Sequence, residues 1–326
     1  MGREIAFLAE YAAGSVARSA LELAAGAAEL ARQSGGTAVA LAYGPGSDRA
    51  AELGAAGAGQ VVALGAGAVP AITFAAAASV AVGALQPMAL LAPATPNGRD
   101  LAAALVGLRG LPAFGPVRAV RIEGGRVRSE QATLQGTVIT ISEPADDAPQ
   151  PAVVLVLAST FTPIEGGSGT AAVAAAPASE PGPFGAAVVV ESHPAEAAVA
   201  NLEEASVIVA GGRGVGSADG FAPLHELAAL LDGAVGASRA AADAGWVPYQ
   251  LQIGQTGKVV KPALYIGCGI SGAIQHRVGM QTAENVLAIN KDPDAPIGEF
   301  ADLFVVGDLF TIVPKLSAEI RRRKGI

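Results

Sequence analysis

Aromatic residues, cysteine and histidine are scarce in this chain of 326 residues: aromatics make up 4% of it, and it has one cysteine and three histidines. The single cysteine, Cys268, excludes an intrachain disulfide and suits a reducing compartment. Because Cys268 lies in an apolar run typical of a strand, we expect a small buried side chain and not a reactive thiol. Three histidines and one cysteine are too few to build a zinc site, so no metal is predicted.

Charged residues are also few, at 15%, and acidic residues outnumber basic ones to give a net charge of −8. Phosphate binding needs clustered cations, so nucleic acid is not expected as a partner. The one basic run, 321–324, is interpreted as a solvated helix C-terminus, where cations complement the helix dipole.

No charged residue occurs between Glu52 and Arg99, but prolines and glycines interrupt that stretch. Its longest helical piece, near 71–84, is shorter than the ~20 apolar residues that span a bilayer, so no membrane insertion is expected. Arg3 and Glu4 directly precede a strand-like segment, which gives no sign of a signal or transit peptide. The sequence therefore predicts a soluble, cytoplasmic protein.

The chain is rich in Ala, Val, Leu and Gly: hydrophobic residues make up 51%, and there are 42 glycines. This composition favours helices packed on a Val-rich parallel sheet, and the length suits two domains. The N-terminal half alternates strand and helix signals. We expect strands at Ile5–Ala9, Thr37–Tyr43, Val61–Leu64 and Met88–Ala92, a helix capped by Ser15, and helices at Ala71–Ala84 and Arg99–Leu108.

From Val117 the pattern changes to that of β-hairpins. The segments Val117–Ile122, Arg126–Thr133 and Thr137–Ser142 predict an antiparallel extension on the mostly parallel sheet. A following stretch, 166–185, is rich in Pro, Gly, Ala and Ser and is interpreted as a surface connector. We place the domain boundary after it: residues 1–194 form an N-terminal α/β domain, and residues 195–326 form a second domain.

The second half returns to strand–helix alternation, which predicts an α/β, doubly wound, Rossmann-like domain. The expected strands are Val207–Ala210, Ala263–Gly267, Val286–Asn290 and Leu303–Val306, with helices at Ala222–Leu231, Arg239–Ala244, from Ser271, and at Thr311–Arg323. Ligands of such sheets bind at the carboxyl ends of strands. Glycine-rich turns follow the first two strands, and glycines let backbone amides approach a pyrophosphate, so a nucleotide is expected there.

A glycine-rich turn alone is weak evidence for a ligand. Arg213 in the first turn is more informative, because an arginine in a glycine loop commonly meets phosphate or carboxylate. Two further segments are hard to explain by structure alone. The segment 255–258 is too polar for a core, and 271–276 places His276 shortly after the predicted helix N-terminus.

Long motifs in the second half resemble the electron-transfer flavoprotein α-subunit family in order and spacing. They are Ala237–Ala240, Ile253–Gly257, Gly269–His276, Ala288–Pro293 and Gly307–Leu309. The N-terminal domain agrees with that family in pattern only. The resemblance implies an FAD-binding C-terminal domain and a heterodimer with a β-subunit that carries AMP or a second FAD. The N-terminal domain, residues 1–194, would contact that partner subunit.

The same resemblance implies an electron carrier without substrate chemistry of its own. Such a heterodimer takes electrons from flavin dehydrogenases, such as the acyl-CoA dehydrogenases of fatty acid β-oxidation. It delivers them to a quinone oxidoreductase or another acceptor. The sequence leaves open whether the complex only relays electrons or also bifurcates them.

The resemblance also implies the cofactor-binding residues. They are Arg213, Ser238, Arg239, Ile253, Gly254, Gln255, Thr256, Ser271, Gly272, Ala273, Ile274, Gln275, His276, Asn290, Asp308 and Leu309. Arg239 would lie against the isoalloxazine ring, Thr256 would hydrogen-bond the flavin N5, and His276 would face the O2 edge. Reduction puts negative charge on the N1–C2=O2 end of the ring, so a donor or cation at His276 raises the potential, and Arg239 adds to the same field.

Two segments depart from the family pattern. Val154–Ala158 stands where the family usually has a Val-Arg-Pro type segment, and Gln131–Gly136 differs from the usual glycine- and asparagine-bearing stretch. Both lie outside the FAD motifs and concern contacts with the partner subunit.

Two other hypotheses compete with the flavin carrier. A nicotinamide-dependent oxidoreductase on a related fold predicts an acidic residue roughly twenty positions past the first glycine turn, where Asp232 stands beside a helix end. A non-redox protein that keeps a nucleotide only for structure is the other. The presence of Arg239, Thr256 and His276 counts against it, because structural binding needs the phosphate groups and not the ring-edge groups.

Overall fold

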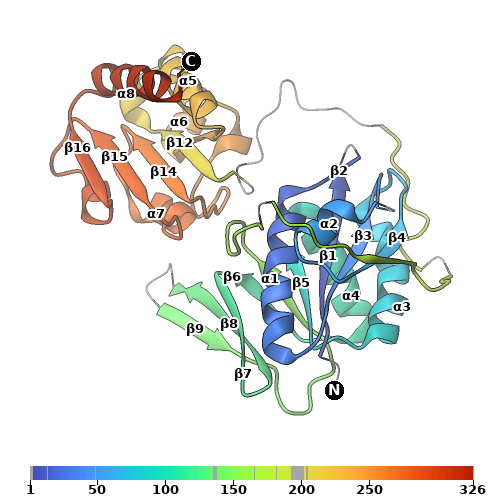
Figure 1. The fold of residues 1–326 in the computed structure, drawn as a ribbon. Coiled ribbons are helices and arrows are strands. Elements are labelled where there is room, and N and C mark those ends of the chain that lie inside the picture. The colour runs from blue at the N-terminus through green and yellow to red at the C-terminus, as the bar shows by residue number, and fades with distance from the viewer. Residues whose placement is uncertain are drawn as a thin grey trace. The chain divides into compact units, whose positions relative to one another are not determined.

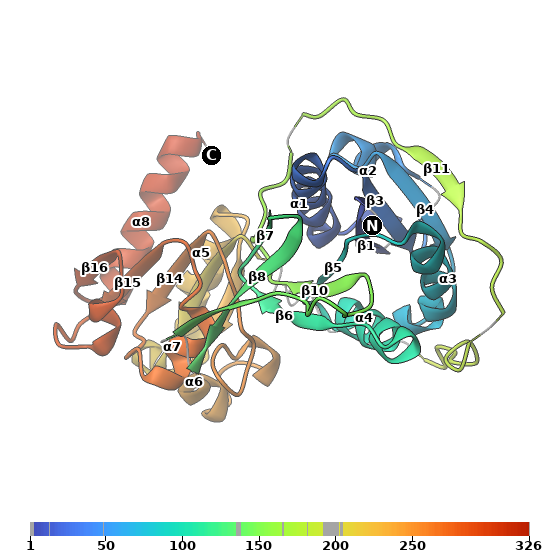
Figure 2. The ribbon, with the colours of Figure 1, turned by 90° about the horizontal axis from the view of Figure 1, so that it is seen from below.

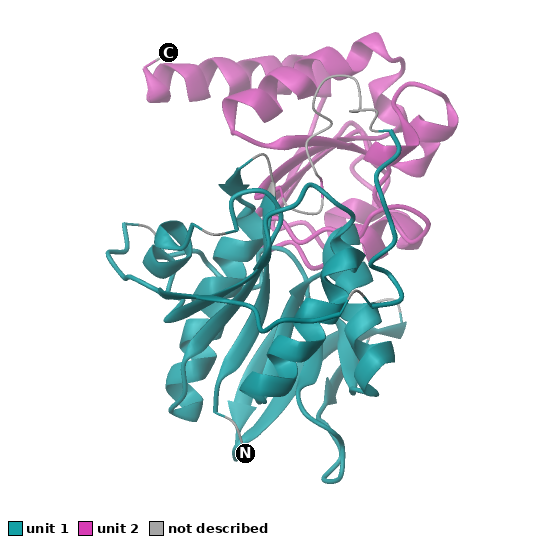
Figure 3. Ribbon diagram, turned by 90° about the vertical axis from the view of Figure 1, so that its right-hand side faces the viewer, with its two compact units in different colours: residues 1–193 teal, residues 194–326 magenta. Residues whose placement is uncertain are grey.

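The computed structural model describes residues 3–12, 14–47, 49–134, 138–164, 166–180, 182–191, 202 and 205–325. The chain divides into two compact units, Met1–His193 and Pro194–Ile326 (Figure 3). The predicted domain boundary at residue 194 lies outside the described residues. Each unit contains its own parallel sheet and its own hydrophobic core.

The N-terminal unit is built on a mostly parallel sheet with the strand order β11-β4-β3-β1-β5-β10-β6 (Figure 1). Its strands are β1 (Ile5–Ala12), β3 (Ala38–Tyr43), β4 (Gln60–Gly65), β5 (Ala89–Pro93), β6 (Ala113–Val117), β10 (Ala152–Val156) and β11 (Ala172–Ala175). Neighbours along this order pair in parallel. The short β2 (Ser15–Val16) pairs antiparallel with the end of β1.

Helices cover both faces of this sheet (Figure 2). They are α1 (Arg18–Ser34) and α2 (Ala51–Ala55) on one face, and η1 (Ala71–Phe74), α3 (Ala75–Leu85) and α4 (Pro96–Arg109) on the other. Alternate residues of β1 point to opposite faces, so Phe7 lies in one hydrophobic cluster with Leu23 of α1, and Leu8 lies in another with Leu101 of α4. A strand buried on both faces has a continuous apolar sequence, which is why β1, β3 and β5 were predictable.

An antiparallel sheet of β7 (Ala119–Glu123), β8 (Arg126–Thr133) and β9 (Val138–Ser142) extends the N-terminal unit, so the predicted extension is confirmed. Gly124 and Gly125 form the turn between β7 and β8, both with positive φ. Arg128 makes exposed ion pairs with Glu123 and Glu143. Exposed ion pairs are screened by water and contribute little to stability, so the strand pairing mainly holds this sheet together.

The C-terminal unit contains a parallel sheet with the order β13-β12-β14-β15-β16 (Figure 1). Its strands are β12 (Val207–Gly211), β13 (Ala234–Ala237), β14 (Leu264–Cys268), β15 (Val286–Asn290) and β16 (Leu303–Val306). The helical segments are η3 (Arg213–Val215), η4 (Asp219–Phe221), α5 (Ala222–Leu230), α6 (Arg239–Asp243), η5 (Tyr249–Leu251), α7 (Ile274–Met280), η6 (Pro296–Glu299) and α8 (Leu309–Lys324). In this sheet β13 lies on one side of β12 and β14 lies on the other, so the winding reverses between β12 and β14. The predicted doubly wound architecture is confirmed.

Across the part of the chain that the structure describes, no helix is both long enough and apolar enough to cross a membrane.

The predicted cap of the first helix is wrong. Ser15 lies in β2, and α1 begins at Arg18 after Ala17, which makes no side-chain cap. The backbone N–H of Ala17 donates to the carbonyl of Glu10 at 3.0 Å instead. The chain therefore reverses by strand pairing before the helix starts, and no serine cap is needed.

The predicted connector contains a strand. β11 lies within 166–185 and pairs in parallel with β4 at the edge of the sheet. Its sequence of three alanines and one valine has little strand propensity, and the pairing with β4 decides its conformation.

The C-terminal unit differs from prediction at two places. β13 was not predicted, because its sequence Ala-Val-Gly-Ala has weak strand propensity, but all four residues are buried beside β12. Helix α7 begins at Ile274 and not at Ser271. Gly272 has φ +82°, a left-handed conformation that ends any helix, so 271–273 is a loop.

Phe221 is the residue through which the core of the C-terminal unit is best tested. It is 2% exposed, and a Cβ on Gly211 of β12 would lie 2.5 Å from its Cε1. We predict that Phe221→Ala lowers the free energy of unfolding of this unit by about 3–5 kcal/mol, because it leaves a cavity. Urea denaturation followed by the fluorescence of Trp246, the single tryptophan, measures this.

The matched control is Phe310→Ala, because Phe310 is 46% exposed. Its cost should stay below about 1 kcal/mol. Equal costs for the two variants would contradict the assignment of Phe221 to the core.

Candidate functional site

Two glycine turns meet at the carboxyl edge of the C-terminal sheet, where the winding reverses between β12 and β14. The N–H of Gly212 donates to the carbonyl of Cys268 at 2.9 Å, and the N–H of Gly214 donates to the carbonyl of Gly269 at 3.0 Å. A Cβ on Gly212 would lie 2.3 Å from the oxygen of Gly269, so only glycine permits this approach. These glycines hold the two turns together, and they leave Arg213 exposed on η3.

A tight loop, 252–258, lies at the same edge beside β13. The N–H of Ile253 donates to the carbonyl of Ala237 at 2.9 Å, which adds one more backbone pairing to the end of β13. Gln252 is 5% exposed, and its Nε2 donates to Oγ1 of Thr256 at 2.9 Å. Because the hydroxyl oxygen of Thr256 is the acceptor in this bond, the hydroxyl proton of Thr256 is available to a ligand.

A hydrogen bond joins this loop to the first turn of α7. The N–H of Gln255 donates to the carbonyl of Gln275 at 2.8 Å. A Cβ on Gly279 of α7 would lie 2.3 Å from the backbone N of Gly254, so the loop rests on the helix without space for a side chain. The predicted segments 253–256 and 271–276 therefore form one surface.

Arg239 begins α6 directly after β13 and is exposed. Its Nε lies 3.3 Å from Oδ2 of Asp243. The other oxygen of this carboxylate, Oδ1, accepts a hydrogen bond from the hydroxyl of Tyr249 at 3.1 Å. The bond to Asp243 raises the pKa of Tyr249. The exposed ion pair between Arg239 and Asp243 contributes about 1 kcal/mol or less, so the guanidinium of Arg239 can turn to a ligand at little cost. The neighbouring Ser238 has a buried Oγ with no hydrogen-bond partner.

His276 lies in α7 and is 7% exposed. Its Nε2 is 2.7 Å from the hydroxyl of Tyr265 in β14, and its Nδ1 has no hydrogen-bond partner. Burial lowers the pKa of His276 to about 4, and the backbone of Ile253 acts in the opposite direction, although no hydrogen bond of normal geometry joins it to Nδ1. The imidazole is therefore neutral near pH 7 and not a cation.

The remaining predicted residues lie around the ends of β15 and β16. Nδ2 of Asn290 donates to the carbonyl of Ile270 at 2.9 Å, which holds the second glycine turn. Asp308 is the N-cap of α8 and accepts from the N–H of Phe310 at 2.8 Å. Leu309 is 6% exposed, and a Cβ on Gly269 would lie 3.1 Å from its Cδ2. Asn290 and Leu309 thus stabilise the second glycine turn, the first by a hydrogen bond and the second by packing.

The structure brings the predicted site residues to one edge of one sheet, although they come from separate strand ends. Sequence reasoning missed their supporting partners, above all Tyr265 and Gln252. A tyrosine inside an apolar strand was a usable signal, because a buried phenol needs a hydrogen-bond partner. Gln252 carried no comparable signal, since its burial depends on the tertiary fold.

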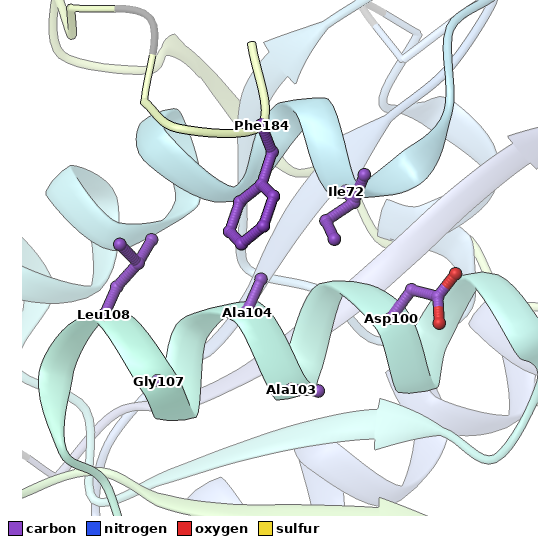
Figure 4. Close-up of a pocket in the computed structure, with 7 residues that line it drawn as sticks. All are labelled: Ile72, Asp100, Ala103, Ala104, Gly107, Leu108 and Phe184. Atoms are coloured by element: carbon purple, nitrogen blue, oxygen red, sulfur yellow. The ribbon is translucent and has the colours of Figure 1, made fainter. Parts of the chain in front are cut away.

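A different hollow lies in the N-terminal unit, lined by Ile72, Asp100, Ala103, Ala104, Gly107, Leu108 and Phe184 (Figure 4). Phe184 points towards α4 and belongs to the hydrophobic cluster on that face. Asp100 is the one charged group among these lining residues. The hollow thus lies where the segment after β11 packs on η1 and α4 of the same unit. Its lining residues offer no convergent polar groups for chemistry.

The strand order and the clustered turns define a class of protein. A parallel sheet of order 2-1-3-4-5 is the flavodoxin-like arrangement, whose ligand lies at the switch point between the first and third strands. In this unit that point lies between β12 and β14, where the glycine turns meet. The unit is therefore a doubly wound nucleotide-binding domain.

Comparison with known proteins identifies the family. A family model described as the electron transfer flavoprotein domain matches residues 5–181, and one described as the electron transfer flavoprotein FAD-binding domain matches residues 201–281. An electron transfer flavoprotein subunit alpha of Mycobacterium leprae is 44% identical over 248 residues, which cover 73% of each chain. The chain belongs to the electron transfer flavoprotein α-subunit family, and its C-terminal unit carries the FAD-binding domain.

Identity is higher in two shorter alignments. The electron transfer flavoprotein subunit alpha of Thermoanaerobacterium thermosaccharolyticum is 60% identical over 126 residues, which cover 39% of this chain and 38% of that protein. The corresponding protein of Bacillus subtilis is 61% identical over 122 residues, or 37% and 38%. These two alignments thus span less than half the length of either relative.

The residues present fit FAD. Ser238 Oγ and His276 Nδ1 are buried polar atoms without partners, and both belong to the predicted cofactor set. A buried polar group that lacks a hydrogen bond is costly, and a polar cofactor group at this edge would remove that cost. Gly254 and Gly272, both with positive φ, bring backbone without side chains to the same edge.

The buried His276 predicts a pH dependence of stability. In the unfolded chain its pKa is near 6.5, and in the folded chain it is about 4, so the unfolded state binds more protons between these values. Stability of the C-terminal unit should therefore fall as the pH drops through this window. The contribution of His276 between pH 7 and pH 5 is about 2 kcal/mol.

This contribution is measured by urea denaturation of wild type and His276→Gln at both pH values. The wild-type loss should exceed that of the variant by this amount, because titrating carboxylates affect both proteins equally. Identical losses would show that the imidazole is not buried in the neutral form.

Cys268 should be inert. Burial raises the pKa of its thiol to about 12, so at pH 8 only about one molecule in 10⁴ carries the reactive thiolate. We predict no alkylation by iodoacetamide in the native protein and one alkylated thiol per chain in urea, counted by mass spectrometry. Rapid native labelling would contradict the buried position in β14.

Proposed function

We propose that this chain binds FAD at the carboxyl edge of the C-terminal sheet and, with an electron transfer flavoprotein β-subunit, carries electrons from flavin dehydrogenases to an acceptor. Acyl-CoA dehydrogenases are the proposed donors and a quinone oxidoreductase the proposed acceptor. A cytoplasmic location is part of the same proposal. The proposal rests on family membership together with the site geometry.

One observation carries the redox role in preference to structural nucleotide binding. The polar groups of the site are not limited to those that hold phosphates. Arg239, Thr256 and His276 reach the same edge, and their supporting contacts leave a charge, a hydroxyl proton and an imidazole nitrogen for a ligand. FAD supplies the two-electron chemistry when bound, and the protein supplies the electrostatic surroundings.

Each of the three residues has a proposed task. Thr256 is held by Gln252 with its proton unused, so it can donate to the flavin N5. His276 offers Nδ1 to the O2 edge of the ring as a neutral group. Arg239 keeps its positive charge at any working pH and stabilises negative charge that develops on the ring.

The backbone around them suits the rest of the cofactor. We assign the phosphates, ribose and adenine to Arg213, Ser238, 253–255, 271–275, Asn290, Asp308 and Leu309. Asn290 and Leu309 act through the turn that they support.

The nicotinamide alternative is weakened by the place of Asp232. Such enzymes bind ribose with an acidic residue at the carboxyl end of the second strand. Asp232 lies before β13, at the opposite edge of the sheet from the glycine turns. Its carboxylate is exposed and lies 3.7 Å from Nζ of Lys324. Asp232 therefore belongs to the turn after α5 and not to the edge of the sheet where the glycine turns meet.

The proposed function is tested by co-expression with the β-subunit. The purified complex should be yellow, with a flavin absorption band, and should release FAD on denaturation. An acyl-CoA dehydrogenase with its substrate should bleach that band. A colourless complex that binds a nicotinamide instead would overturn the proposal.

A single residue tests the ring-edge assignment. His276→Ala should lower the midpoint potential of the bound flavin, because a hydrogen bond to the negatively charged end of the reduced ring is lost, while FAD stays bound. Potentiometric titration measures the shift, and His225→Ala is the control because His225 is exposed on α5. An unchanged potential in His276→Ala means that His276 does not face the ring.

A further inference from the structure

Tyr265 connects the interior of the C-terminal sheet to the proposed ring-edge histidine. It is the second residue of β14 and is fully buried. Its hydroxyl lies 2.7 Å from Nε2 of His276, and the two rings are tilted by 58° with centroids 6.1 Å apart. The phenol is therefore part of the hydrogen-bonding environment that decides how His276 meets a ligand.

The direction of this hydrogen bond follows from counting unpaired groups. Suppose that the phenol donates to Nε2: the imidazole proton then sits on Nδ1, and one group, the Nδ1–H, lacks a partner. If Nε2–H donates to the phenol instead, the phenol proton and the bare Nδ1 both lack partners. Each unpaired buried polar group is costly, so the first arrangement, which leaves fewer of them, is favoured.

The ionisation states of both groups agree with that arrangement. Burial holds the pKa of Tyr265 well above its usual value, with a smaller contribution from Cys268, so the phenol keeps its proton. Burial keeps His276 neutral near pH 7, so one of its nitrogens is free of a proton and can accept. A phenylalanine at 265 would fill the same space but would give Nε2 no donor.

We propose that Tyr265 is a positioning residue: its hydroxyl donates to Nε2 of His276 and thereby keeps the imidazole proton on Nδ1, from which it is donated to the carbonyl edge of the flavin. The inference rests on the proposed function for its second half, the donation to FAD. Its first half, the position of the proton, concerns the chain alone.

The position of the proton is measured by ¹⁵N NMR of the full chain labelled at histidine. The sequence has three histidines, and His276→Gln assigns the relevant signals by their loss. In the wild type without FAD, His276 should show a protonated Nδ1 and an unprotonated Nε2 at pH 7. A wild-type proton on Nε2 overturns the proposal without any further variant.

Tyr265→Phe is the direct perturbation. It should move His276 to a mixture of tautomers with a substantial share of Nε2–H, whereas Tyr11→Phe, which removes a phenol hydroxyl from the N-terminal unit, should leave the signals of His276 unchanged. An unchanged tautomer in Tyr265→Phe shows that the phenol does not direct the proton and overturns the proposal.

The flavin potential of the complex tests the second half. Tyr265→Phe should lower the midpoint potential by less than His276→Gln does, at unchanged FAD content. It should cause no further shift when combined with His276→Gln, because both act through the same nitrogen. A purely structural effect of Tyr265 would instead lower FAD content or stability in both backgrounds.

The outcomes separate the two proposals. If the tautomer changes as expected but neither variant moves the potential, the donation to the flavin is refuted together with the ring-edge role of His276. If His276→Gln moves the potential and Tyr265→Phe leaves both tautomer and potential unchanged, the proposed function stands and the role of Tyr265 is refuted.

Discussion

The close approach of two backbone turns at the switch point of the C-terminal sheet is the constraint on which the rest of the site depends. Gly212 and Gly214 pair with Cys268 and Gly269 at a separation that leaves no room for a Cβ. The carboxyl ends of β12 and β14 are thereby brought to one edge, and Asn290 ties the end of β15 to the second turn. The arrangement of the proposed cofactor-binding residues follows from this packing of backbone on backbone.

Burial gives the site its chemical character. The groups that would meet the phosphate and ring of a flavin are of two kinds: exposed side chains with weak partners, such as Arg239, and buried atoms with none, such as Nδ1 of His276. The first kind can rearrange at little cost, whereas the second is already oriented by its surroundings. A site that combines both kinds can admit a large cofactor and still set the electrostatic field at one end of its ring.

Some parts of the fold were predictable because the sequence pattern and the tertiary environment agree. The strands β1, β3 and β5 are buried on both faces, so their apolar runs identify them. β13 and β11 were missed because their small residues have weak strand propensity and become strands only by pairing with β12 and β4. The start of α7 was misplaced because Ser271 looks like a helix cap, while the left-handed Gly272 after it prevents a helix.

The sequence by itself determined the family and the cofactor class, because these depend on contiguous motifs whose residue types are specific, and the same motifs supplied the proposed site residues. Only the tertiary structure decided the protonation and orientation of those residues. Tyr265 and His276 are eleven positions apart on a strand and a helix, and no local pattern predicts that a phenol will meet Nε2. Gln252 likewise reaches Thr256 only because the loop closes tightly beside β13. Hydrogen-bond direction and desolvation arise from packing between elements. The sequence therefore left open whether His276 is a donor or a cation, whereas the fold makes it neutral.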